Sequence, residues 1–141
     1  MFDESLRDLL QATRVIAIIG AKDKPGQPVD RVGRYLLAAG YTVLPVHPVR
    51  RSVWGLPAFP DCASLPQPAD IINVFRAPQY CPGHAAEVLS LPWRPHAFWM
   101  QEGIRSPEAG RMLAAQGIRV MEDLCIKTEH IRLLGGNAHH G

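Results

Sequence analysis

The sequence has few cysteines, and none of them stands in a pair with metal-binding spacing. Its three cysteines, Cys62, Cys81 and Cys125, are an odd number, and there is no C-x-x-C pair. The odd count argues against a disulfide framework, and the missing pairs argue against a zinc ribbon. This pattern predicts free thiols in a reducing cytoplasm and predicts no metal site.

The chain also lacks long apolar stretches and a large excess of charge. No apolar run approaches the ~20 residues that span a bilayer. Asp3 and Glu4 stand where a signal peptide would carry basic residues. The formal net charge is only +2, which is too small to indicate a nucleic-acid-binding protein. We therefore expect neither a membrane nor a nucleic acid as a partner.

What the sequence does contain is an alternation of short apolar runs and amphipathic segments. Hydrophobic residues make up 47% of the 141 residues, which is enough for one packed domain. Runs rich in Val and Ile predict strands, and apolar residues at helical spacing predict helices. The predicted strands cover residues 14–20, 41–46, 70–75, 96–101 and 118–121, and the predicted helices cover 3–12, 29–40, 80–91, 106–117 and 126–133.

This order of elements predicts an α/β fold. Short apolar strands joined by helices favour a Rossmann-like, doubly wound parallel sheet of about five strands with helices on both faces. Residues 47–69 contain five prolines and are expected to form a long, irregular connection. Residues 1–134 are interpreted as a single domain and residues 135–141 as a flexible tail. The apolar content also allows a homodimer.

Basic residues follow the predicted strands at the point where each strand ends. In open parallel sheets, ligands bind beyond the carboxyl ends of the strands. The alternative is that these residues only make the loops polar. We favour an anionic ligand at this edge. Of the fifteen Lys and Arg residues, the seven at strand ends are Lys22, Lys24, Arg50, Arg51, Arg76, Arg105 and Lys127.

The first turn has a glycine suited to phosphate binding, but it lacks the spacing of known dinucleotide and ATP motifs. Gly20 allows the chain to approach a phosphate closely, and the following helix directs its N–H groups to the same place. G-x-G-x-x-G is absent, since Lys22 stands where the motif needs its second glycine, and the P-loop motif is absent as well. After the second strand, an NAD site would need an acid, but residues 47–51 read H-P-V-R-R. Two guanidiniums suit a phosphate on a ribose, which is found in NADP and in coenzyme A.

Five stretches occur in order at the ends of the predicted strands: I-A-I-I-G-A (16–21), L-P-V-H-P (44–48), D-I-I-N-V-F-R (70–76), F-W-M-Q-E-G-I-R (98–105) and M-E-D-L-C-I-K-T-E-H (121–130). In these stretches the sequence resembles the small single-domain CoA-binding proteins, relatives of the CoA-binding domain of the succinyl-CoA synthetase alpha subunit. The resemblance implies a Rossmann-like fold with coenzyme A as its ligand. The synthetase carries its phosphorylated histidine in a second domain, for which this chain is too short, so the synthetase reaction is not implied.

The resemblance also implies the positions that bind coenzyme A. Lys24 and His47 join the set because they follow the first and second strands; many relatives have Asn where this chain has His47. The implied positions are Gly20, Ala21 and Lys22 at the pyrophosphate, Pro48 and Arg50 at the ribose 3′-phosphate, Val74, Phe75 and Arg76 along the nucleotide, Gln101, Gly103 and Ile104 near the pantetheine arm, and Cys125 after the fifth strand.

Three functions stay open at this point. The leading prediction is a binding module that holds coenzyme A, or a short acyl-CoA, without catalysis. The second is an NADP-dependent oxidoreductase that binds the 2′-phosphate with Arg50 and Arg51. The third is a redox or acyl carrier role through Cys125, which precedes a helix N-terminus; a buried, inert cysteine is its alternative. Glu129 and His130, which follow on the same helix, are expected at the surface.

Aromatic residues are expected mainly in packing roles. Trp99 lies within a predicted strand and should be part of the core. Trp54 lies in the proline-rich connection, where it is able to approach a ligand.

Overall fold

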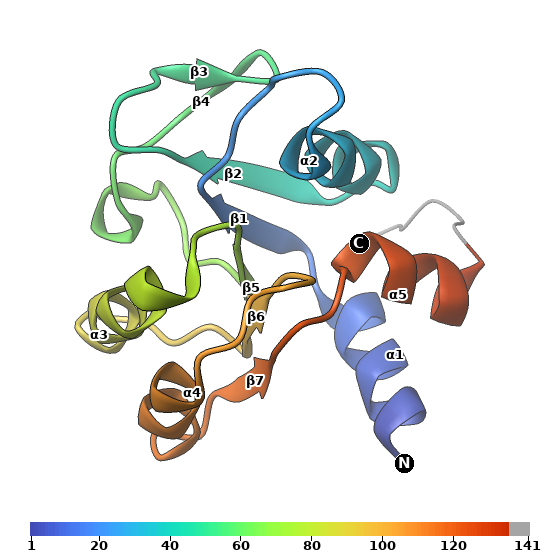
Figure 1. Ribbon diagram of the computed structural model, residues 1–141. Helices are drawn as coiled ribbons and strands as arrows, with labels where there is room; N and C mark the ends of the chain where they lie inside the picture. Colours follow the sequence, from blue (N-terminus) through green and yellow to red (C-terminus); the bar gives the residue numbers. More distant parts are fainter. Residues whose placement is uncertain (136–141) are drawn as a thin grey trace.

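The structure, a computed structural model, describes residues 1–135 and is built around a five-stranded sheet (Figure 1). All neighbouring strands in this sheet are parallel. The strand order reverses between β1 and β5, and this reversal creates a switch point at the carboxyl edge. In spatial order the strands are β2 (Thr42–Val46), β1 (Val15–Ile19), β5 (Ile71–Val74), β6 (Ala97–Met100) and β7 (Arg119–Met121).

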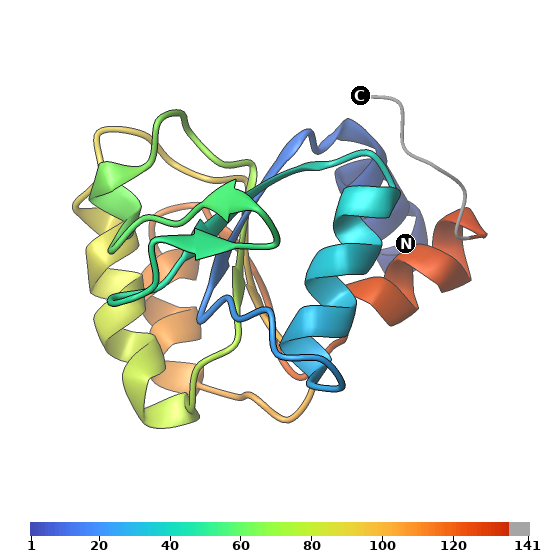
Figure 2. The same cartoon turned by 90° about the horizontal axis from the view of Figure 1, so that it is seen from above.

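Helices cover both faces of the sheet, as Figure 2 shows from above. One face carries α1 (Phe2–Ala12), α2 (Pro28–Ala38) and α5 (Ile126–Leu134), and the other carries α3 (Cys81–Leu89) and α4 (Pro107–Ala114). Each face has its own hydrophobic core. The prediction of a Rossmann-like, doubly wound α/β fold is therefore confirmed.

The three central strands, β1, β5 and β6, are almost entirely apolar because both of their faces are covered, and Asn73 on β5 is their one polar residue. Successive side chains of a strand point to opposite faces. Ile16 and Ile18 accordingly pack under α2, whereas Ala17 and Ile19 pack in the core on the other side. Trp99 on β6 is fully buried, as expected, and its indole N–H donates to the carbonyl of Leu124 at 2.8 Å.

The connection between β2 and β5 is more ordered than the sequence predicts. It contains a small hairpin of β3 (Ser52–Val53) and β4 (Leu56–Pro57), followed by a 3-10 turn, η1 (Cys62–Ser64). Trp54 and Gly55 form the tip of the hairpin with φ values of 55° and 73°. Two consecutive residues with positive φ match a tight hairpin turn, for which Asn-Gly or Asp-Gly is the usual signal. The expectation of an irregular connection holds for most of residues 47–69 but missed this hairpin, because its Trp-Gly tip does not carry that signal.

The remaining boundaries agree with the expected ones to within a few residues. A second 3-10 turn, η2 (Pro78–Tyr80), leads into α3. Gly135 caps α5 in the left-handed conformation, with φ of 70°. The other residues of the predicted tail, 136–141, lie outside the described residues. No helix within residues 1–135 is both long and apolar enough to cross a membrane.

Candidate functional site at the carboxyl edge of the sheet

The turns that follow β1, β2 and β5 meet at the switch point of the sheet. They enclose a cavity of about 430 Å³, here called the first cleft. The beginning of α2 completes its wall, as the position of a helix N-terminus in a phosphate site would require. The side chains and backbone that line the first cleft include Gly20, Lys22, Pro28, His47, Phe75 and Arg76.

Gly20 shapes the first cleft by its conformation. Its φ is +85°, and a Cβ built on it would lie 2.4 Å from the carbonyl oxygen of Phe75. The backbone N–H groups of Gly20 and Ala21 both donate to the carbonyl of Val46, at 3.0 and 3.3 Å. These two amides thus join the end of β1 to the end of β2. The closely approaching group at Gly20 is the chain at Phe75, a contact that the sequence does not reveal.

Two side chains and the N-terminus of α2 bring positive charge to the first cleft. Lys22 and Arg76 both line it, and the guanidinium of Arg76 lies 4.4 Å from the centre of the Tyr80 ring. The helix α2 begins at Pro28 after Gln27, and no side chain caps its N-terminus. The positive end of the helix dipole therefore faces the same cavity.

The pKa of His47 is sensitive to these positive charges. Burial, together with the charges of Arg50, Lys22 and Arg76, lowers the pKa of His47 below its ordinary value. The Nδ1 atom of its ring accepts hydrogen bonds from the backbone N–H groups of Val49, at 3.1 Å, and Arg50, at 3.0 Å. The three positive charges that oppose a proton on His47 favour a bound anion in the same cavity.

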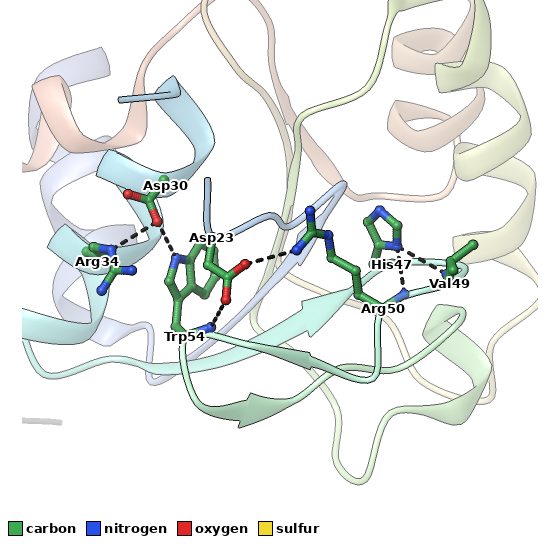
Figure 3. A network of polar contacts seen from close by, with 7 residues as sticks. All are labelled: Asp23, Asp30, Arg34, His47, Val49, Arg50 and Trp54. Atoms are coloured by element: carbon green, nitrogen blue, oxygen red, sulfur yellow. Dashed lines mark hydrogen bonds and ion pairs between the residues drawn. The ribbon is translucent and has the colours of Figure 1, made fainter. Parts of the chain in front are cut away.

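Arg50 lines neither the first cleft nor the cavity beside it, but it belongs to a polar network next to His47 that Figure 3 shows. Its guanidinium donates to Asp23 at 3.0 Å, and the other carboxylate oxygen of Asp23 accepts from the backbone N–H of Trp54 at 3.2 Å. The indole N–H of Trp54 donates in turn to Asp30 at 2.9 Å. The hairpin is thereby attached both to the turn after β1 and to α2. Lys24 is exposed beyond this network and lines neither cleft.

Trp54 packs against α2 and lines neither the first cleft nor the cavity beside it. A Cβ on Gly33 would lie 2.1 Å from two carbons of the indole ring, so the ring occupies the space that Gly33 leaves on the helix. Asp30, its hydrogen-bond partner, is only 5% exposed. A glycine inside a predicted helix was the available sign that another group comes close to the helix at this position.

A second cavity, of about 590 Å³ and here called the second cleft, lies between α2 and the beginning of α5. Pro28 and Phe75 line both clefts, so the two cavities adjoin along the carboxyl edge. The second cleft is also lined by Val32, Gln101, Gly103, Cys125 and Lys127.

Gln101 fixes the beginning of α5. It is only 3% exposed, and its side-chain oxygen accepts the backbone N–H of Ile126 at 3.0 Å. The turn after β6 is fixed too, because the N–H of Gly103, at φ of +84°, donates to Asp123. That hydrogen bond and the nearby Arg105 hold the pKa of Asp123 below its usual range.

Two of the predicted site residues direct their side chains elsewhere. Val74 is fully buried in the core beneath α3 and α4, and Ile104 packs against the same core. Any contact of Val74 with a ligand in the clefts would come from its backbone.

The three cysteines are all free, and they lie in different surroundings. Cys125 is half-buried, forms the N-cap of α5 and lines the second cleft. Cys62 and Cys81 are buried. Burial raises the pKa of Cys62 to about 12 and raises that of Cys81 as well. Within residues 1–135, no group of three or more His, Cys, Asp or Glu side chains is placed to hold a metal ion.

Glu129 and His130 are buried, so their expected surface positions are wrong. His130 is fully buried, and its Nδ1 lies 2.6 Å from the hydroxyl of Tyr35 on α2. Glu129 is 7% exposed and accepts two hydrogen bonds from Arg132. Helical spacing alone did not show that α2 covers this side of α5.

Known proteins are similar to this chain in sequence and, where their structures are solved, in fold. The uncharacterized protein YneT of Bacillus subtilis (strain 168) is 35% identical over 125 residues, which are 89% of this chain and 91% of YneT. The solved structure of cell-free ID.343 from Thermus thermophilus has 41% sequence identity and a TM-score of 0.89, and the match covers 94% of this chain and 99% of that one.

A larger protein contains the same fold as one part of its chain. The dinucleotide-forming acetyl-coenzyme A synthetase 1 of Ca. Korarchaeum cryptofilum superposes with a TM-score of 0.65 over 81% of this chain and 27% of its own, at 19% identity. The model of the CoA binding domain family matches residues 14–131. These findings confirm the resemblance seen in the five sequence stretches: the chain belongs to the CoA binding domain family.

Proposed function

We propose that this protein binds coenzyme A, or a short acyl-CoA, across the two clefts without converting it. The observation that carries this proposal is the pair of adjoining cavities that share Pro28 and Phe75. The first cleft is lined by the positive charges of Lys22 and Arg76, whereas the second carries charges of both signs and the thiol of Cys125. Coenzyme A has the same division, because a phosphate-rich nucleotide is joined to a long pantetheine arm that ends in sulfur.

In this proposal the phosphates occupy the first cleft. Lys22, Arg76 and the N-terminus of α2 surround the space for a pyrophosphate. Arg50 would reach the ribose 3′-phosphate from its position next to His47, with Lys24 farther out. A guanidinium that donates one N–H to Asp23 keeps other donors for a phosphate.

The pantetheine arm would pass Phe75 and enter the second cleft. Gln101 and Gly103 line its path, and Cys125 lies in the same cavity. A mixed disulfide between Cys125 and the ligand thiol would need a two-electron oxidant, and binding itself does not require this bond. Three free cysteines agree with a reducing, cytoplasmic setting.

Calorimetric titration with coenzyme A, 3′-dephospho-CoA and NADPH under reducing conditions tests the proposal. We expect binding of coenzyme A that weakens when the 3′-phosphate is missing, and no binding of NADPH. Binding of NADPH without binding of coenzyme A would overturn the proposal and would favour the oxidoreductase instead.

A further inference from the structure

The two ring nitrogens of His47 have different surroundings. Nδ1 accepts backbone hydrogen bonds from Val49 at 3.1 Å and Arg50 at 3.0 Å. A ring nitrogen that accepts hydrogen bonds carries no proton, so the proton of the neutral ring is on Nε2. Figure 3 shows Nε2 on the side of the ring away from these two contacts. Because His47 lines the first cleft, the ring is able to donate from Nε2 to a bound anion.

The same two hydrogen bonds fix the loop that carries Arg50. They turn the chain back toward β2, as a side-chain acceptor does in an Asx turn. The side chain of Arg50 then reaches across to Asp23 at 3.0 Å. Without an acceptor at Nδ1, the backbone N–H groups of Val49 and Arg50 would lose their partner. His47 therefore determines where the guanidinium of Arg50 stands.

Charged groups approach His47 from three segments. Lys22 comes from the turn after β1, Arg50 from the loop of His47 itself and Arg76 from the end of β5, and all three oppose a proton on the ring. Asp23, an acid in the turn after β1, is paired with Arg50. The partial burial of the ring and, after it, these three positive charges lower the pKa of His47, so the neutral form is the one present near pH 7.

We propose that neutral His47 is a positioning residue of the phosphate site: it donates from Nε2 to the ligand, and through Nδ1 it holds the loop that presents Arg50. This inference rests on the proposed function, because it concerns the same anion site. Protonation of Nδ1 would place a hydrogen against two N–H donors and release the loop. Acid should therefore weaken binding, although simple electrostatics predicts that an extra positive charge strengthens the binding of an anion.

Calorimetric titrations of coenzyme A from about pH 7.5 to about pH 5, a range that spans the ordinary pKa of histidine, test this proposal. The matched variant is His47→Asn, because an amide oxygen accepts the same backbone N–H groups and takes up no proton in this range. Protonation of the ligand's own phosphate near pH 6 affects both proteins equally. We expect the affinity of the unmodified protein to fall about tenfold more than that of His47→Asn, which corresponds to the loss of one charged hydrogen bond. A rise in affinity toward acid, or the same pH profile in both proteins, would overturn the proposal.

A second measurement needs no ligand. The backbone amide signals of Val49 and Arg50 are followed by NMR while the ring of His47 is titrated. We expect both signals to shift with the midpoint of His47, below 6.5, and to stay constant in His47→Asn. Constant signals in the unmodified protein would overturn the proposed hold on the loop. If these amides titrate but coenzyme A binds at no pH, the hold on the loop is supported and the ligand of the proposed function is wrong.

Discussion

Asp23 and Arg50 are 27 positions apart in the chain, and their side chains form an ion pair at 3.0 Å. Asp23 belongs to the turn after β1 and Arg50 to the loop after β2, so the pair joins two walls of the first cleft. The side chains are 34% and 31% exposed, and an ion pair in such surroundings contributes about 0–1 kcal/mol to stability. We interpret the pair mainly as a device that orients Arg50.

Replacement of this arginine, Arg50→Ala, should weaken the binding of coenzyme A by about 1.5–3 kcal/mol, because one charged hydrogen bond to the 3′-phosphate is lost. The affinity for 3′-dephospho-CoA should hardly change. Calorimetry on both ligands measures the difference. Arg51→Ala is the matched control, since Arg51 is an exposed neighbour in the same loop. An equal loss for the two ligands would remove Arg50 from the 3′-phosphate site.

At the end of β1, Gly20→Ala should lower the free energy of unfolding by about 2 kcal/mol or more. The alanine would have to adopt a φ of +85° and place its Cβ 2.4 Å from the carbonyl oxygen of Phe75. Gly26→Ala separates the two causes: Gly26 has φ of +86° and no atom within 4 Å of a built Cβ. Gly26→Ala should lower the free energy of unfolding by only about 1 kcal/mol. Urea unfolding that finds equal losses would show that the close contact at Phe75 has no effect.

On α2, Gly33→Ala should reduce stability, although alanine is the better helix former. The new methyl group would displace the indole ring of Trp54 and its hydrogen bond to Asp30, at a net cost of about 1–3 kcal/mol. The NMR signal of the Trp54 indole N–H should move at the same time.

The control for this substitution is Gly83→Ala on α3, where a built Cβ meets no atom within 4 Å. That variant should gain about 1 kcal/mol from helix propensity alone. A gain of the same size in Gly33→Ala would show that the indole ring of Trp54 moves aside without any loss of stability.

Alkylation of the native protein with iodoacetamide should modify Cys125 first. Cys62 and Cys81 are buried, and their raised pKa values keep the thiols protonated at neutral pH. Mass spectrometry of the peptides identifies the modified residue. If the pantetheine arm occupies the second cleft, saturating coenzyme A should slow the reaction at Cys125. Unchanged alkylation in the presence of bound coenzyme A would place the arm elsewhere.

Asn73 offers a test of the core. It is fully buried on β5, and neither the nitrogen nor the oxygen of its amide has a hydrogen-bond partner among the described residues. Asn73→Leu, which has a similar volume, should raise the free energy of unfolding by about 1–2 kcal/mol, since it removes two unsatisfied polar groups. Asn73→Asp is the opposite control and should destabilise the protein. A loss of stability in Asn73→Leu would contradict the absence of a polar partner.

The sequence was sufficient to predict the strands of the sheet, because the apolar residues of each strand indicate that both of its faces are buried. The run that ends at Gly20 is apolar at every position, as a strand covered on both faces must be. The grouping of Lys22, His47 and Arg76 also followed from the rule that ligands lie beyond the carboxyl ends of parallel strands.

What the sequence could not give were contacts between distant segments. The pairing of Trp54 with α2 and the burial of His130 beside Tyr35, 95 positions away, depend on how the elements pack in three dimensions. Periodicity within one helix indicates which face is apolar, but it does not identify the helix that covers it. Arg50 was recognised as a basic residue after β2, while its partner Asp23 could be found only from the fold.

Because Phe75 and Pro28 belong to both clefts, they constrain how this protein is able to evolve. A substitution at Lys22 alters only the first cleft, and one at Lys127 alters only the second, so each end of a ligand can be tuned separately by such outer residues. A change at Phe75 acts on both ends at once. New ligand preferences should therefore arise from substitutions at the outer residues, while Phe75 stays unchanged because it lines both clefts.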